Sequence, residues 1–131
     1  MTVHHYQFGS LTVDGNMIIG EMREAEDIGV EVMHETFRLA RETFGDAPWA
    51  YISNRSNSYS LQPIVYVRAR ETDTNLVAYA VVLPSSRTQI YTDTEKMLVD
   101  DHFEYAVFHS MDDARAWAES ILSRSSNQPS S

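Results

Sequence analysis

Eight consecutive apolar residues, Leu76 to Leu83, limit the folds that are open to this chain. A strand that is apolar on both faces belongs in the middle of a sheet whose two faces are both covered. A second short apolar stretch runs from Pro48 to Ser53, and a third, Phe103 to Phe108, is rich in aromatic residues. The sequence therefore predicts a sheet with buried central strands, not a bundle of helices.

The start of the chain predicts two further strands. Residues 5–13 and 16–22 have extended apolar patterns, and Asp14-Gly15 between them is a strong signal for a tight hairpin turn. We expect both strands to belong to the same sheet.

Helical patterns separate the later strands. Apolar residues recur at steps of three and four, and Gly45 follows them, which predicts a helix over Ala25 to Phe44. Residues 88–99 can form another helix. Ser110, with Asp113 three residues later, resembles a shortened capping box and predicts the start of the last helix.

Residues 61–72 fit two interpretations. Val65 to Arg70 alternates as a strand would, whereas Ser60 is a possible N-cap and Pro63 fits a first helical turn. We favour a short helix.

Together these elements predict a single α/β domain over residues 1–123. The expected order is β-β-α-β-α-β-α-β-α, in a four- or five-stranded mixed sheet with helices mainly on one face. Residues 124–131 are serine-rich and hold no core residue, so we expect a disordered tail.

Composition narrows the class of protein. The chain has no cysteine, so it has no disulfide framework and no Cys-based zinc site. Its net charge of −9 disfavours nucleic acid as a partner. No apolar run approaches the ~18–20 residues of a transmembrane helix, and no signal peptide is recognisable, so we expect a cytoplasmic protein. A homo-oligomer is compatible with the sequence.

The stretch after the strand at 48–53 is the candidate site. It consists of Asn54, Arg55, Ser56, Asn57, Ser58, Tyr59 and Ser60. Hydroxyls, Arg55 and backbone N–H groups at a helix start would form an anion site. The same residue types also cap helices and stabilise turns without any ligand. Because Arg55 is the loop's only formal charge in an acidic chain, we expect it to be exposed and to accept an acidic group or a phosphate.

With this order of elements the chain resembles the STAS-like domains, the fold of sulfate transporters and anti-sigma-factor antagonists, and their SpoIIAA-like relatives. Within that fold it is similar to a group of small bacterial proteins. The resemblance covers about residues 4–123 and rests on the topology and on two stretches, PWAYISNRSNSYSLQP and FHSMDDARAWAESIL. In anti-sigma-factor antagonists the loop after the central strand carries a serine that a partner kinase phosphorylates. Here that position falls at Ser56, Ser58 or Ser60.

The resemblance implies a non-enzymatic protein-interaction or regulatory domain that acts through this loop and binds an unknown protein partner. The alternative is a small-molecule or lipid-binding domain of the SpoIIAA-like type. In that case the six methionines and the seven tyrosines and five phenylalanines could line an apolar cavity. Arg68 or Arg70 would then meet the acidic head group.

Motifs for catalysis or metal binding are weak. In His34-Glu35-Thr36-Phe37-Arg38 an arginine stands where the second zinc-binding histidine of H-E-x-x-H is needed. Asp100-Asp101-His102 with Glu104 could offer oxygen ligands to a divalent ion, but a solvated acidic turn before a strand explains these residues better. The chain has no G-x-S-x-G elbow, phosphate loop or dinucleotide-binding glycine pattern. We therefore expect no metal, no cofactor and no enzymatic activity.

Overall fold

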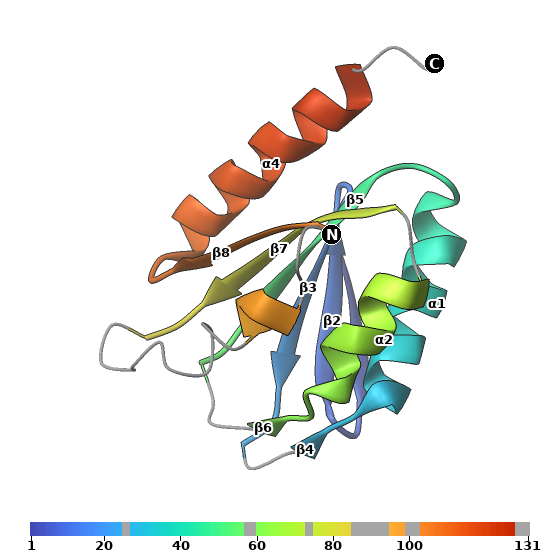
Figure 1. Ribbon diagram of the computed structural model, residues 1–131, viewed down its shortest axis with the longest axis vertical. Coiled ribbons are helices and arrows are strands. Elements are labelled where there is room, and N and C mark those ends of the chain that lie inside the picture. The colour runs from blue at the N-terminus through green and yellow to red at the C-terminus, as the bar shows by residue number, and fades with distance from the viewer. Residues whose placement is uncertain (25–26, 57–59, 73–74, 85–94, 99–102, 128–131) are drawn as a thin grey trace.

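The computed structural model describes residues 1–24, 27–56, 60–72, 75–84, 95–98 and 103–127 (Figure 1). Its main feature is a six-stranded mixed sheet with the strand order β1-β2-β3-β5-β7-β8. The strands are β1 (Thr2–Tyr6), β2 (Gly9–Asp14), β3 (Met17–Met22), β5 (Trp49–Asn54), β7 (Leu76–Val82) and β8 (Glu104–Phe108). The first three pair antiparallel, whereas β3, β5, β7 and β8 are parallel.

Helices cover both faces of this sheet. Two of them, α1 (Val30–Phe44) and α2 (Ile64–Thr72), pack on one face, and α4 (Met111–Asn127) lies on the other (Figure 1). Residues 95–98 form a further helical turn between β7 and β8. A small second sheet pairs β4 (Asp27–Ile28) with β6 (Ser60–Leu61) in parallel.

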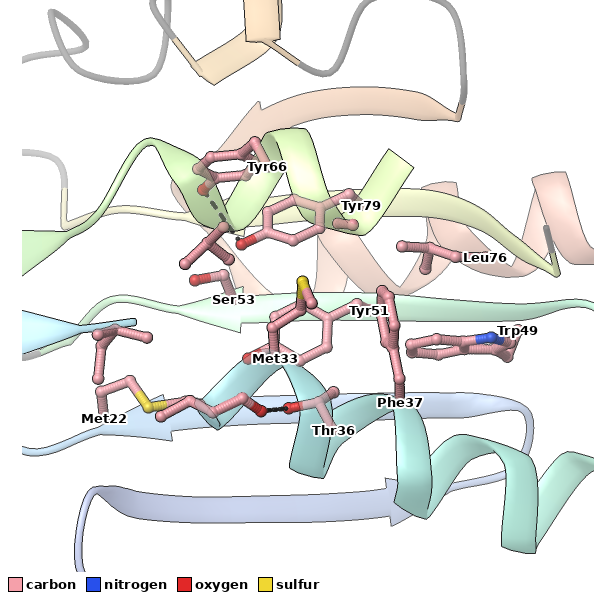
Figure 2. A pocket seen from close by; sticks show the side chains of 14 residues that line it. Met22, Met33, Thr36, Phe37, Trp49, Tyr51, Ser53, Tyr66, Leu76 and Tyr79 are labelled. Atoms are coloured by element: carbon pink, nitrogen blue, oxygen red, sulfur yellow. Dashed lines mark hydrogen bonds between the residues drawn. The ribbon is translucent and has the colours of Figure 1, made fainter. Parts of the chain in front are cut away.

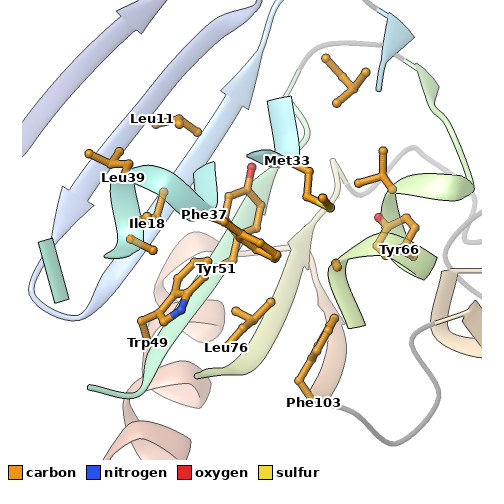
Figure 3. Close-up of a cluster of buried hydrophobic side chains, with 14 of the residues drawn as sticks. Leu11, Ile18, Met33, Phe37, Leu39, Trp49, Tyr51, Tyr66, Leu76 and Phe103 are labelled. Carbon is orange, nitrogen blue, oxygen red and sulfur yellow. The ribbon is translucent and has the colours of Figure 1, made fainter. Parts of the chain in front are cut away.

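The two faces have different cores. The face under α1 and α2 is rich in large side chains, among them Phe37, Trp49 and Tyr66 (Figure 3). The face under α4 is rich in alanine, and Ala78, Ala80 and Ala118 are fully buried there.

The parallel strands β3, β5, β7 and β8 lie side by side in the order in which they occur in the chain. Crossovers of one hand then place their connecting helices on the same face, as seen for α1 and α2. Among the described strands this order does not reverse, so they form no topological switch point of the kind that creates a ligand crevice in many α/β proteins.

Several local predictions are confirmed. The run Leu76–Leu83 contains β7, which lies between β5 and β8. Gly45 ends α1 with φ at 61°, and its N–H donates to the carbonyl oxygen of Arg41. Ser110 caps α4, because its Oγ accepts the backbone N–H of Asp113 at 3.3 Å. The helix expected over residues 61–72 is present over 64–72, whereas Leu61 belongs to β6.

Three boundaries differ from the prediction. The single strand expected over 5–13 is two strands, β1 and β2, separated by a turn that ends at Gly9 (φ 147°). The sheet therefore has six strands, and the element order begins with one strand more than expected. A side chain at Gly9 would also meet the Glu21 carbonyl oxygen at 2.2 Å. The helix expected from Ala25 begins only at Val30, because residues 27–28 form β4, which pairs with β6.

The third difference is at the end of the chain. The helix α4 continues to Asn127, so residues 124–127 belong to a helix and not to the expected tail. Of the helix expected over 88–99, the structure describes only residues 95–98, which are helical.

Candidate functional site

The polar loop after β5 does not form one exposed surface. Asn54 donates from Nδ2 to Oε2 of Glu21 at 3.1 Å, and Ser56 is exposed. Ser60 belongs to β6 and pairs with Asp27, and α2 begins only at Ile64, so Ser60 is not at the N-cap position. Residues 57–59, which include Ser58, lie outside the described residues. The described residues of the loop therefore point to different surroundings.

Arg55 turns into the protein, and the expectation that it is exposed is wrong. Only 8% of the residue is accessible to solvent. Its Nε donates to Oγ of Ser53 at 3.0 Å, and its Nη2 donates to the hydroxyl of Tyr66 at 2.8 Å. The same Nη2 atom lies 2.8 Å from Oε2 of Glu95, in an ion pair that is shielded from water.

Glu95 is the partner that sequence reasoning missed. It lies on the helical turn 95–98 and is 7% exposed. Its Oε2 also accepts the hydroxyl of Tyr66, and its Oε1 accepts the hydroxyl of Tyr105 at 3.0 Å. Arg55, Glu95, Tyr66 and Tyr105 are therefore joined in one hydrogen-bonded group, which we call the Arg55 cluster.

The electrostatics of the cluster favour neutral tyrosines. Burial raises the pKa of Tyr66, and the nearby Tyr79 and Glu95 add to this effect, while Arg55 opposes it. Burial and the Glu95 carboxylate likewise raise the pKa of Tyr105. Both phenols therefore keep their protons and act as hydrogen-bond donors towards Glu95.

An apolar cavity of about 60 Å³ adjoins the cluster, between α1, α2 and the sheet (Figure 2). Its apolar walls come from helices and strands alike. The lining residues are Met22, Ile28, Val32, Met33, Thr36, Phe37, Trp49, Tyr51, Ser53, Val65, Tyr66, Ala69, Leu76 and Tyr79.

One end of the cavity is polar. Ser53, Tyr66 and Tyr79 line the cavity, and Figure 2 shows the hydrogen bond between the two tyrosine hydroxyls. Their oxygen atoms lie 3.2 Å apart. Ser53 and Tyr66 also bind Arg55. The cavity and the Arg55 cluster therefore share residues, which makes them a single candidate site with an apolar body and a polar end.

The two arginines expected to meet a head group are placed differently. Arg68 is exposed on α2 and does not line the cavity, and the side chain of Arg70 lies outside the described part of the chain. Arg55, by contrast, contacts two residues of the cavity wall, Ser53 and Tyr66.

The other candidate sites have fewer buried polar and charged groups than the Arg55 cluster. A shallow hollow of about 410 Å³ lies beside the turn between β2 and β3, where Arg115 of α4 pairs with Asp14 at 2.5 Å. Among the described residues, no group of three His, Asp or Glu side chains could hold a metal ion. Residues 100–102 of the acidic turn lie outside those residues.

Comparison with known proteins gives no relative: no family model, no curated protein and no solved structure matches the chain. Within the described residues, no helix is both long and apolar enough to cross a membrane.

Proposed function

We propose that this domain binds a small, mainly apolar molecule in the cavity between α1, α2 and the sheet. The observation that supports the proposal most directly is the cavity itself, which has apolar walls and one polar end formed by Ser53, Tyr66 and Tyr79. Concave, mostly apolar sites with a few converging polar groups are the usual form of a small-molecule site.

The volume limits the ligand. At about 60 Å³ the cavity is smaller than the ~150 Å³ engineered cavities that hold benzene, so it accepts an apolar group of a few heavy atoms. Met22 and Met33 lie in its wall, and methionine side chains adapt to the shape of a ligand at low cost.

Methyl NMR tests the proposal directly. In a protein labelled at the methionine methyl groups, xenon gas and 1-propanol should shift the signals of Met22 and Met33 in a saturable way. Met17, which is buried under α4, and Met97, which is 80% exposed, serve as internal controls because they are not in the cavity wall. Equal shifts at all four methionines, or none at Met22 and Met33, would reject a binding cavity.

A cavity-filling variant sharpens this test. Ala69→Val adds two methyl groups to the wall of the cavity and should abolish the shifts. The matched control is Ala116→Val on the exposed side of α4, which carries the same helix-propensity cost and should leave the shifts unchanged.

A second candidate function is recognition of a partner protein, which would be in line with the resemblance to STAS-like domains. The observation in its favour is that Ile64 and Met97, two exposed large apolar residues, lie on α2 and on the helical turn that carries Glu95. Isolation of the native protein followed by mass spectrometry tests it. A specific partner that is lost in Ile64→Ser or Met97→Ser, or a phosphate on Ser56, Ser58 or Ser60, would support it.

A further inference from the structure

The carboxylate of Glu95 has the surroundings that a carboxylate ligand would need. One of its oxygens is bound by Arg55 and Tyr66, and the other accepts the hydroxyl of Tyr105. A guanidinium and two hydroxyls recognise a carboxylate through charge and direction together. These three groups come from the end of β5, from α2 and from β8, whereas Glu95 is supplied by the separate turn 95–98.

We propose that Arg55, Tyr66 and Tyr105 form a binding site for the carboxylate of a short-chain monocarboxylic acid, and that Glu95 fills this site in the present structure. The Glu95 side chain is then an internal substitute for the ligand. An incoming acid replaces its carboxylate and takes over its three hydrogen bonds. In the wild-type chain the acid competes with Glu95, which lowers its apparent affinity.

The cavity gives the alkyl chain of the acid a place. Tyr66 belongs both to the carboxylate site and to the cavity wall, and its hydroxyl lies 3.2 Å from that of Tyr79, which also lines the cavity. A carboxylate at the position of Glu95 would therefore have an apolar space of about 60 Å³ next to it, which suits a short chain and excludes a long one. This part of the inference rests on the proposed function, whereas the carboxylate site does not.

Chemical rescue of Glu95→Ala tests the inference. The substitution removes the internal carboxylate and leaves a space beside Arg55, so the variant should unfold at a lower temperature than the wild type. Sodium acetate should raise its Tm by about 3 °C or more at saturation, compared with sodium chloride at the same ionic strength. Butyrate should reach the same effect at a lower concentration. The wild type should respond at least about tenfold more weakly, because Glu95 competes with the acid.

Two further variants identify the source of any rescue. Arg55→Ala combined with Glu95→Ala should lose the response to both acids, because the guanidinium is absent. Ala69→Val combined with Glu95→Ala should keep the response to acetate and lose the advantage of butyrate, because the cavity is filled. If Glu95→Ala does not fold in chloride, it is refolded in sodium acetate or butyrate, and the yield of folded protein is compared with that in sodium chloride at the same ionic strength.

The outcomes separate the two proposals. If no acid stabilises or refolds Glu95→Ala better than chloride does, or if the response survives without Arg55, the carboxylate site is rejected whatever xenon does in the cavity. If acetate and butyrate act equally, the carboxylate site holds and its continuity with the cavity is rejected.

Discussion

The Nη2 atom of Arg55 lies 2.8 Å from Oε2 of Glu95, although the two residues are 40 positions apart in the chain. Both side chains are almost fully shielded, at 10% and 9% exposure. A buried ion pair adds little net stability when it forms, but removing one partner leaves the other charge in a medium of low polarity. The cluster therefore links the end of β5 to the turn 95–98, and removing one of the two charges should lower the free energy of unfolding.

Arg55→Ala should lower the free energy of unfolding by about 3–5 kcal/mol, because it removes the cation beside the buried Glu95 carboxylate. Urea unfolding at pH 7 measures this difference. The matched control is Arg23→Ala, in which an exposed arginine is removed at a cost within about 0.5 kcal/mol. A loss below about 1 kcal/mol for Arg55→Ala would mean that water reaches the pair.

Alkaline pH should destabilise the protein through Tyr66 and Tyr105. Folding raises the pKa of both phenols, so the unfolded chain loses these protons first as the pH rises. Their contribution is complete below about pH 10 and then falls by up to ~1.4 kcal/mol per pH unit for each tyrosine. In Tyr66→Phe, the loss of stability between pH 10 and pH 11.5 should be less steep, as measured by urea unfolding.

The chain offers a clean control for this pH dependence. Phe44→Leu alters a ring that packs against the same core and carries no ionisable group, so it should leave the slope above pH 10 unchanged. An unchanged slope in Tyr66→Phe, or a changed slope in Phe44→Leu, would assign the alkaline transition to other groups.

The elements of the fold could be predicted where the signal is local. The two-sided apolar run of β7, the glycine that ends α1 and the serine that caps α4 each depend on neighbours in the sequence. The start of α1 could not be predicted, because Asp27 and Ile28 pair with residues 60–61. The residues next to them in the sequence give no sign of this distant contact.

The candidate site could be predicted only in part, for the same reason. The polar loop after β5 drew attention to Arg55. Because Arg55 carries the only formal charge in that loop, the sequence suggested that its side chain is exposed. An arginine is buried only when it is paired, and its partner Glu95 lies far along the chain in a segment with no special pattern. The cavity depends on the relative placement of α1, α2 and the sheet, which the composition in methionine and aromatic residues does not specify.

Asp14→Asn should cost about 0.2–1 kcal/mol at pH 7, because it removes an ion pair between Asp14 and Arg115 that is partly open to solvent. The hydrogen bond from Arg115 lowers the pKa of Asp14. The stabilisation is therefore present above about pH 4 and is lost as the pH falls through the lower, folded-state pKa. Urea unfolding should show the two proteins converging near pH 2. Asp46→Asn, at an exposed position, is the control, and an equal effect there would argue against the pair.

Gly20→Ala should disturb the cavity and lower the free energy of unfolding by about 1–3 kcal/mol. A Cβ atom on Gly20 would lie 1.8 Å from the hydroxyl oxygen of Tyr51 and 2.7 Å from its Cζ atom, so this ring, which forms part of the cavity wall, has to move. At Gly29, by contrast, the nearest atoms are the ends of Glu31 and Gln62 at 3.0 and 3.2 Å, so Gly29→Ala should cost less than about 1 kcal/mol. Adding Tyr51→Phe removes the closest atom and should recover part of the loss in a double-mutant cycle based on urea unfolding. Equal costs at the two glycines, with no coupling to Tyr51, would show that the ring is not held against β3.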